Sequence, residues 1–215
     1  AILRVHDSQR ATQEAALLAE AGNIAQLVDR EFDRIETGLQ VLARTAPLSS
    51  GDSVAITAAL RNGAAPLDGA QLALVEGSGR RIIASSLPRE SAASLPFGDA
   101  VQEALARGRG VSDLLAQDGT PVIAVAMPVP PRAEEAPIEV LVAVLPRTRL
   151  DAILRTGLEA VHRSTASALV VDPAGRVVAQ TGTGAVSPDD AAWLLRAAAQ
   201  PDAERTEDQT LLAGP

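Results

Sequence analysis

The residues best suited to bind a ligand lie close together between positions 80 and 89. They are three arginines and two serines: Arg80, Arg81, Ser85, Ser86 and Arg89. In a β-strand, Arg81 and Ser85 would point to the same face because side chains alternate along a strand. Guanidinium groups beside hydroxyl groups can hold a carboxylate. The stretch therefore predicts a site for an organic acid, and ordinary solvation of a sheet edge is the alternative.

Other patterns that could support catalysis or metal binding are weak. His6 and His162 are distant in sequence, and Glu159 with His162 fits a solvated helix end better than a pair of metal ligands. The block 51–53 (Gly-Asp-Ser) is similar to the nucleophile motif of some esterases. It follows a polar loop and has no histidine partner, so a helix cap is the better interpretation. The Gly-x-Gly at 182–184 lacks the rest of a phosphate fingerprint. We predict no catalytic residue, metal or cofactor.

The composition is that of an acidic globular protein of one or two domains. The 215 residues are 47% hydrophobic and 21% charged, with a net charge of −8, and every basic residue is an arginine. Nucleic-acid binding is not expected, because it requires a basic face. The aromatic residues are Phe32, Phe97 and Trp193 only, so stacking platforms and aromatic cages are excluded. The absence of cysteine excludes disulfides and thiolate metal sites.

The element that must position everything else is a long helix predicted over Gln9–Ala46. Its apolar residues recur every three or four positions: Leu17, Ala21, Ile24, Val28, Phe32, Ile35, Leu39 and Leu42. A helix of ~38 residues is ~57 Å long, which is typical of a coiled coil or a membrane-linked stalk. Two ordinary helices broken near Gly22 are the alternative. The abrupt opening Ala1–Val5 resembles the end of a transmembrane segment, or an arbitrary boundary.

The remaining elements predict an α+β protein in which helices cover one face of antiparallel sheet. Residues 71–76 and 80–86 form a hairpin, and 138–145 should be a central strand because it is almost wholly apolar. The full set is a loop at 48–51, helices at 54–61 (ended by Asn62-Gly63), 99–107, 147–163 and 188–199, and strands at 71–76, 80–86, 111–116, 122–129, 138–145, 168–171 and 176–180.

A second copy of the hairpin is visible in the sequence. Residues 73–86 align without gaps on residues 168–181, and Arg81 matches Arg176, which favours a structural turn role for Arg81. The alignment therefore predicts two copies of one α/β unit. Chance similarity of Ala/Val-rich hairpins is the alternative. The second copy ends at Pro215, where two more strands should begin. We therefore predict that this copy is incomplete.

The order of these elements resembles the double Cache sensor module of bacterial membrane receptors. The matching segments are 28–34 in the long helix, 77–80, Ser112-Asp113, 118–121, 126–129 and the hairpin turn 172–176. The resemblance implies a long helix (1–46) with two stacked PAS-like sheet units, one membrane-distal (47–146) and one membrane-proximal and truncated (147–215). Members that bind amino acids or amines use Tyr and Trp around the ligand. This distal unit has neither, which argues against that class of ligand.

The resemblance also implies a function. The chain is expected to be the periplasmic ligand-sensing region of an inner-membrane receptor, itself not an enzyme, most similar to sensor histidine kinases of two-component systems. Chemoreceptors and diguanylate cyclases use the same module. The expected partners are a small-molecule ligand, such as an organic acid, and a second copy in a parallel dimer through the long helix. A protein-interaction scaffold and a hydrolase acting through Ser53 are the other classes.

Overall fold

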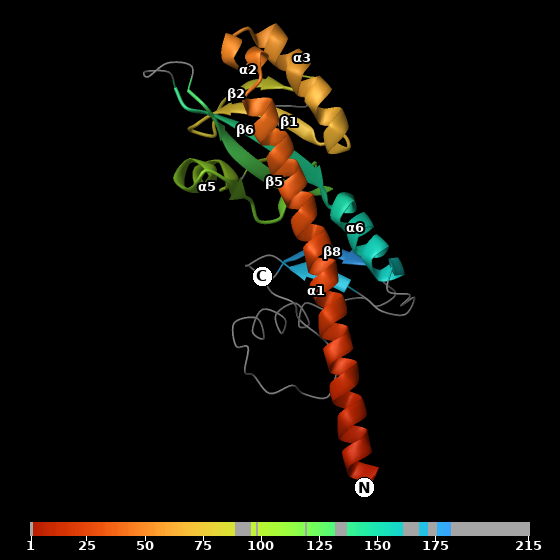
Figure 1. Cartoon of the computed structure of the whole chain (residues 1–215). Coiled ribbons are helices and arrows are strands. Elements are labelled where there is room, and N and C mark those ends of the chain that lie inside the picture. Colours follow the sequence, from red (N-terminus) through yellow and green to blue (C-terminus); the bar gives the residue numbers. More distant parts are fainter. Residues whose placement is uncertain are drawn as a thin grey trace. The chain divides into compact units, whose positions relative to one another are not determined.

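The structure is a computed structural model that describes residues 2–88, 96–97, 99–118, 120–131, 137–160, 168–171 and 176–181 (Figure 1). The chain divides into two compact units. One comprises Ala1–Arg30 with Leu150–Pro215, and the other comprises Glu31–Arg149. The first helix, α1, contributes residues to both units.

Helix α1 spans Ile2–Ala43 without interruption, which confirms the predicted long helix. The alternative break at Gly22 is wrong. The helix ends three residues before the predicted Ala46 because Thr45 is extended, with ψ 146°, and precedes a second short helix. That helix, α2 (Ala46–Ser50), lies where a loop was predicted at 48–51. It ends at Gly51, which has a positive φ of 77°.

Helix α3 (Ser53–Ala64) begins as predicted at a capping residue. Asp52 Oδ1 accepts a hydrogen bond of 2.9 Å from the Val54 amide, so this aspartate is the cap and Ser53 is the first helical residue. The helix does not end at Asn62-Gly63. A Cβ on Gly63 would lie 2.9 Å from Leu42 Cδ2, so this glycine serves the close approach of α3 to α1.

The unit Glu31–Arg149 contains an antiparallel sheet in the order β2-β1-β6-β5-β3, with β4 also paired to β5. The predicted central position of 138–145 is confirmed, because β6 lies between β1 and β5. The predicted strand 111–116 is wrong as one piece and forms β3 and β4. The bounds are β1 (Gln71–Glu76), β2 (Ile82–Ser85), β3 (Gly110–Val111), β4 (Leu115–Gln117), β5 (Thr120–Val129) and β6 (Glu139–Pro146).

Ser112 explains why that strand divides. Its amide donates to the Ala124 carbonyl (2.8 Å), and its hydroxyl accepts from the Ala124 amide (2.9 Å). The side chain thus replaces one backbone acceptor of the ladder, and the chain leaves the regular strand path after it. Helix α5 (Ala100–Arg107) precedes β3 and ends at Gly108, as predicted, with a φ of 81°.

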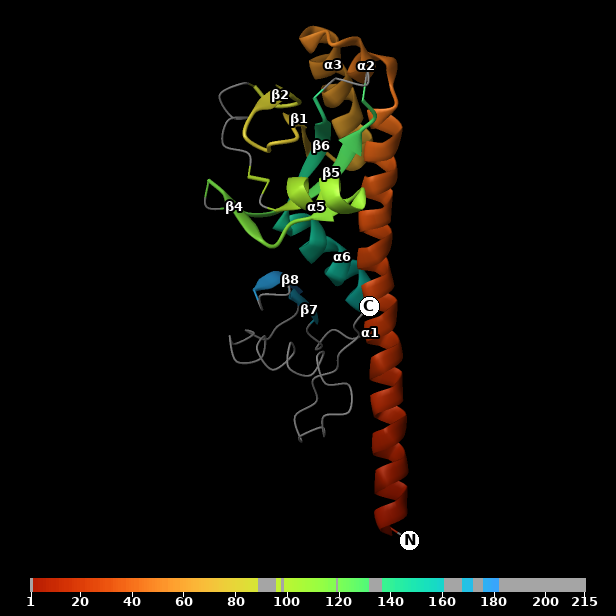
Figure 2. The same ribbon diagram turned by 90° about the vertical axis from the view of Figure 1, so that its left-hand side faces the viewer.

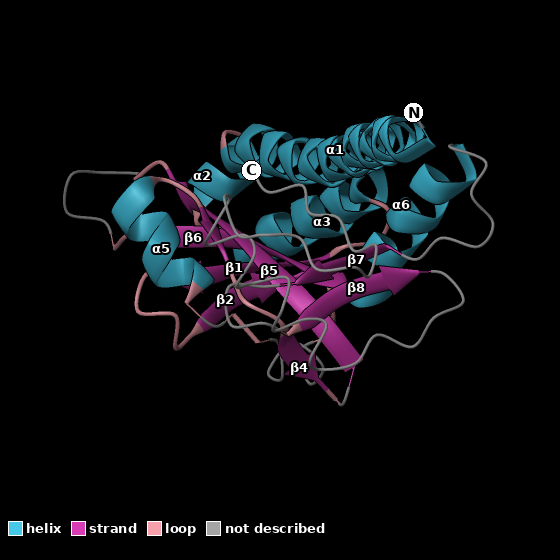
Figure 3. Ribbon diagram, turned by 90° about the horizontal axis from the view of Figure 1, so that it is seen from below, coloured by secondary structure: helices cyan, strands magenta, loops and turns pink. Residues whose placement is uncertain are grey.

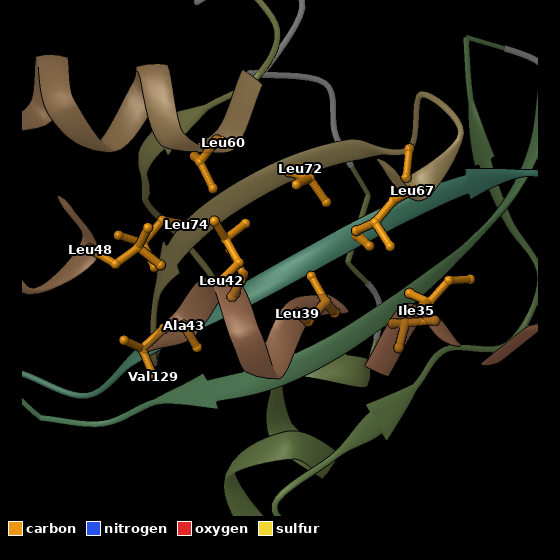
Figure 4. Packing of buried hydrophobic residues seen from close by; sticks show 14 of the residues in the cluster. Ile35, Leu39, Leu42, Ala43, Leu48, Leu60, Leu67, Leu72, Leu74 and Val129 are labelled. Atoms are coloured by element: carbon orange, nitrogen blue, oxygen red, sulfur yellow. The ribbon is translucent and has the colours of Figure 1, made fainter. Parts of the chain in front are cut away.

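Each face of this sheet carries its own apolar core. On one face the second half of α1 packs with α2 and α3 against alternate strand residues, including Leu72, Leu74 and Val129 (Figures 3 and 4). On the other face α5 packs through Val101 and Ala104 against the intervening residues, such as Val75 and Val142 (Figure 2). The expectation that helices cover one face only is therefore wrong. The strands are apolar on both sides because both sides are covered.

In the other unit, α6 (Arg147–Ala160) packs on the first half of α1 from Leu150 onward, and β7 (Ala168–Val171) pairs with β8 (Val177–Thr181). A Cβ on Gly157 would lie 3.0 Å from Ile24 Cγ1, which marks the close contact of the helices. Asp151 Oδ1 accepts a hydrogen bond of 2.8 Å from the Gln180 amide. The predicted turn 172–175 and helix 188–199 lie outside the described residues, as do the end of the predicted helix at 161–163 and the chain end.

The two hairpins share one irregularity. Both ladders skip one residue of their second strand, Ile83 in β2 and Val178 in β8. These residues occupy equivalent positions in the aligned segments 73–86 and 168–181, but the strand register differs by one residue, since Ala73 pairs with Ser85 whereas the equivalent Ala168 pairs with Thr181. The internal repeat stays a prediction. The α+β fold with a long N-terminal helix is confirmed. Within the described residues, no helix combines the length and the apolar character needed to cross a membrane.

Candidate ligand site

A small cavity opens at the end of the six-stranded sheet, in the unit Glu31–Arg149. Its volume is about 190 Å³. It is lined by four polar and three apolar residues: Gln71, Gln117, Asp118, Thr120, Val122, Val144 and Pro146. Val122 and Val144 belong to the core under α5, so the cavity lies on that face of the sheet. The opposite face carries α1.

The strand pairing explains why these residues meet. Gln71 begins β1 and pairs with Val144 of β6, and Pro146 of β6 pairs with Val122 of β5. Gln117 ends β4, where it pairs with Thr120. The ends of four strands therefore surround the cavity.

The two glutamine amides are held by each other. Gln117 Nε2 donates a hydrogen bond of 2.9 Å to Gln71 Oε1. A carboxamide offers both donors and acceptors, so each amide keeps groups with which to meet a ligand. Asp118 has a positive φ of 49° and is the charged residue of the lining. The lining can thus hydrogen-bond a small polar molecule, and its charge is opposite to that of the arginine site predicted from the sequence.

The structure gives the predicted site residues other partners. Ser85 Oγ donates to the Leu72 carbonyl (3.2 Å) and accepts from the Leu87 amide (3.0 Å), while Ser86 Oγ accepts from the Leu72 amide (2.9 Å). Both hydroxyls therefore fasten the end of β2 to β1. Arg81 Nε lies 3.3 Å from Glu76 Oε2 in an exposed ion pair.

Arg80 is exposed, and its amide bonds to the Ser78 hydroxyl at 3.3 Å. Arg89 lies outside the described residues. The expectation that Arg81 and Ser85 share a face is wrong because the skipped residue Ile83 breaks the two-residue alternation between them. Whether these five residues bind a ligand stays a prediction, and none of them lines the cavity.

A second group of polar side chains joins three elements of the same unit. Glu31 and Arg34 come from α1, Asp68 from the turn before β1, and Arg149 from the first turn of α6. We call these four residues the arginine–carboxylate cluster. Arg34 meets Glu31 through two bonds, Nε to Oε2 at 3.2 Å and the second guanidinium nitrogen to Oε1 at 2.9 Å, and it also bonds Asp68 Oδ2 at 2.6 Å.

Arg149 binds the same two carboxylates. Its Nε donates to Glu31 Oε1 at 3.0 Å, and its terminal nitrogen contacts Asp68 Oδ2. The pKa of the Asp68 carboxyl is therefore lowered, first by the hydrogen bond from Arg34 and then by the charge of Arg149. The pKa of Arg34 is raised, mainly by its hydrogen bond to Glu31.

Neither the cavity nor the cluster was predicted from the sequence. Residues 71–76 were correctly predicted as a strand, but Gln117 and Thr120 belong to β4 and β5, and the polar ends of these strands meet Gln71 only through the order β1-β6-β5, which the sequence does not reveal. The one local signal was that Gln71, Gln117 and Thr120 are polar residues at strand ends. In the described part of the chain, no group of three or more metal-binding side chains is found.

The comparisons with known proteins show the fold. No known family matches the chain, and neither does any curated protein. The ligand-binding domain of the Pseudomonas aeruginosa PAO1 amino acid chemoreceptor PctC, in complex with GABA, has a TM-score of 0.54 and 18% identity, covering 91% of this chain and 86% of its own. The sensory domain of the Campylobacter jejuni chemoreceptor Tlp3 has a TM-score of 0.55 and 13% identity, covering 83% and 74%.

The chain has the fold of a chemoreceptor sensory domain. This agrees with the resemblance to extracytoplasmic Cache-type sensors that the sequence suggested. The two neighbours are sensory domains of chemoreceptors, so the chemoreceptor alternative fits the fold as well as the histidine kinase does.

Proposed function

We propose that this chain is the extracytoplasmic ligand-sensing region of a membrane-bound signalling receptor and is not itself an enzyme. The observation that carries the proposal is the position of α1 relative to the sheet that lines the cavity. Ile35 and Leu39 of α1 are wholly buried against the same strands whose ends form the cavity. A displacement of these strands therefore changes the packing of α1. Transmission of a signal requires such a coupling.

The proposed ligand is a small polar molecule bound in the cavity. The lining contains three apolar residues and four with hydrogen-bonding groups, the usual composition of a small-molecule site. A closed and wholly apolar pocket would favour the scaffold alternative, whereas this lining includes four polar residues. The neighbour PctC is described in complex with GABA, itself a small polar molecule. The arginine stretch 80–89 is the second candidate site, for organic acids.

A thermal-shift screen tests the proposal. The chain is screened against organic acids and against uncharged or amine-bearing small molecules. Gln117→Leu removes the amide pair of the cavity, and Arg81→Gln removes the exposed guanidinium of the other site. A ligand whose stabilising effect is lost in Gln117→Leu and kept in Arg81→Gln binds at the cavity, and the reverse result assigns it to the arginine stretch. If no compound in either series raises the melting temperature, the sensing proposal is overturned.

The rest of the receptor is proposed from the resemblance. We infer a membrane-anchored protein that forms a parallel homodimer through α1, with a histidine kinase or a chemoreceptor signalling domain as output. Light scattering of a version that includes the membrane segments tests the dimer, and a monomer at high concentration would contradict it. The gene sequence on both sides of these 215 residues tests the output: two membrane spans followed by a kinase or chemoreceptor signalling domain are expected.

A further inference from the structure

The arginine–carboxylate cluster (Glu31, Arg34, Asp68 and Arg149) connects the surroundings of the cavity to α1. We propose that this cluster is the element through which a change at the cavity reaches the long helix. The inference rests on the proposed sensing function and assigns to these four residues the coupling step of that function. Its test requires no ligand, so the inference can fail while the sensing proposal stands.

The cluster is adjacent in the chain to two of the four strands whose ends surround the cavity, β1 and β6. Asp68 lies three positions before Gln71, and Arg149 lies three positions after Pro146. Gln71 and Pro146 both line the cavity. A displacement of the start of β1 or of the end of β6 therefore moves a member of the cluster.

On the other side, the cluster holds α1 through two residues that lie one helical turn apart. The Glu31 side chain is only 11% exposed and accepts from both arginines. Asp68 also receives both arginines. Because each carboxylate is shared, moving Arg149 changes the partners available to Arg34, and the four groups respond together. Two separate ion pairs would lack this property.

The positions of Glu31 and Arg149 in the chain add to the argument. They are the first and the last residue of their compact unit, at the two points where the chain passes between the units. The ion pair between them joins α1 to α6 at these points. The pair therefore links the residue at which the chain enters the sheet-bearing unit to the residue at which it leaves.

The turn that carries Asp68 is held by backbone hydrogen bonds, from the Asp68 amide to the Ala65 carbonyl (3.1 Å) and from the Gly69 amide to the Ala64 carbonyl (2.9 Å), and also by Arg34. Asp68 has a φ of 54°, in the left-handed region, and Arg34 donates a second bond of 3.0 Å to the Pro66 carbonyl. A non-glycine residue in this region is sparsely populated and persists when its surroundings hold it. Loss of the Arg34 contacts therefore removes the side-chain restraints on the turn in front of β1 and leaves its backbone hydrogen bonds in place.

The experiment measures amide hydrogen exchange along α1 after a change in the cavity. Gln117→Ala breaks the amide pair at the cavity and touches no residue of the cluster. We expect it to speed exchange of the α1 amides around residues 31–39 by about twofold to fivefold, the range that corresponds to one partly exposed ion pair. In an Arg149→Gln background, the same Gln117→Ala change should alter these rates by less than the measurement error.

The matched control is Arg107→Gln. It removes an ion pair of the same kind, Arg107 to Glu103 at 2.9 Å, on α5. The response of α1 to Gln117→Ala should persist in this background. Asp68→Asn provides a second way to open the cluster in case Arg149→Gln does not fold, as judged by circular dichroism. An equal response with and without the cluster, or no response in the otherwise unchanged protein, would overturn the inference.

Discussion

The two halves of α1 follow the same apolar pattern but pack in different ways. In the half that belongs to the sheet-bearing unit, Ile35 and Leu39 are wholly buried, and a Cβ on Gly38 would lie 2.6 Å from Leu67 Cδ2 (Figure 4). In the other half, Val28 is the one buried residue among residues 19–30, and Gly22 has no atom within 4 Å of the place of a Cβ. The helical stripe is therefore a necessary sign of burial but does not measure it, because burial depends on what the rest of the chain packs against it.

The largest expected difference between the halves is in the cost of shortening a leucine. Leu39→Ala should lower the free energy of unfolding by about 2–5 kcal/mol, because it leaves a cavity among the strands and α3. Leu27→Ala, in the half that is only partly buried, should cost about 1 kcal/mol, since less apolar area is lost. Urea unfolding followed by circular dichroism measures both. Equal costs would show that the two halves are packed alike.

The glycines of α1 should respond to alanine with opposite signs. Gly22→Ala should stabilise the protein by about 0.5–1 kcal/mol, because alanine is the better helix former and the space is open. Gly38→Ala should destabilise the protein by about 1 kcal/mol. The new methyl group displaces the buried side chain of Leu67, and the cost of that displacement exceeds the free energy gained from the higher helix propensity of alanine. Thermal unfolding of the two variants and the parent tests the signs. Stabilisation by both would mean that Leu67 can rotate away at little cost.

Sequence predicted the fold wherever a local signal was sufficient. The bounds of β1 are as predicted, the cap of α3 lies at Asp52 as expected, and Gly108 ends α5. The predictions were wrong where contacts between residues distant in sequence determine the end of an element or the burial of a face. Gly63 is typical of a helix end, yet here it lies within α3. The side chain of Leu42 occupies the position next to it, where a Cβ would collide. The strands are apolar on both faces, but only the structure shows that α5 is what covers the second face.

The candidate site was less predictable than the fold for the same reason. Arg81 and Ser85 were expected on one face from alternation, and the skipped residue Ile83 removes that relation. Ser85 and Ser86 carry hydroxyls suited to a ligand, but those hydroxyls bond to Leu72 in the next strand. The cavity depends on the pairing of β1 with β6, residues about 70 positions apart. No local pattern encodes such a pairing.

The arginine–carboxylate cluster lies where α1 passes from one kind of packing to the other, since Glu31 is the first residue of the sheet-bearing unit. Removing Arg34 should therefore loosen the buried half more than the other half. Arg34→Gln should cost about 0.5–1 kcal/mol of stability, because the pairs are partly exposed and form a network. Hydrogen exchange should rise chiefly around residues 31–43. Arg30→Gln, an exposed residue one turn earlier, is the control, and an equal rise in both variants would contradict the prediction.

The smallest expected effect is on the pH dependence of stability. The pKa of Asp68 is lower in the folded state than in the unfolded chain, first because of the hydrogen bond from Arg34. The unfolded state therefore binds a proton more readily, and the stabilisation is fully present above the unfolded pKa of about 3.9 and is lost as the pH falls through the folded pKa. Asp68→Asn and Arg34→Gln should each flatten this acid limb in urea unfolding between about pH 5 and pH 2, whereas Arg107→Gln should leave it in place. If the unfolding free energy of Asp68→Asn keeps the same dependence on pH, the interaction of the Asp68 carboxylate with Arg34 does not contribute to the acid limb. The change in packing along α1 would then not depend on this ion pair.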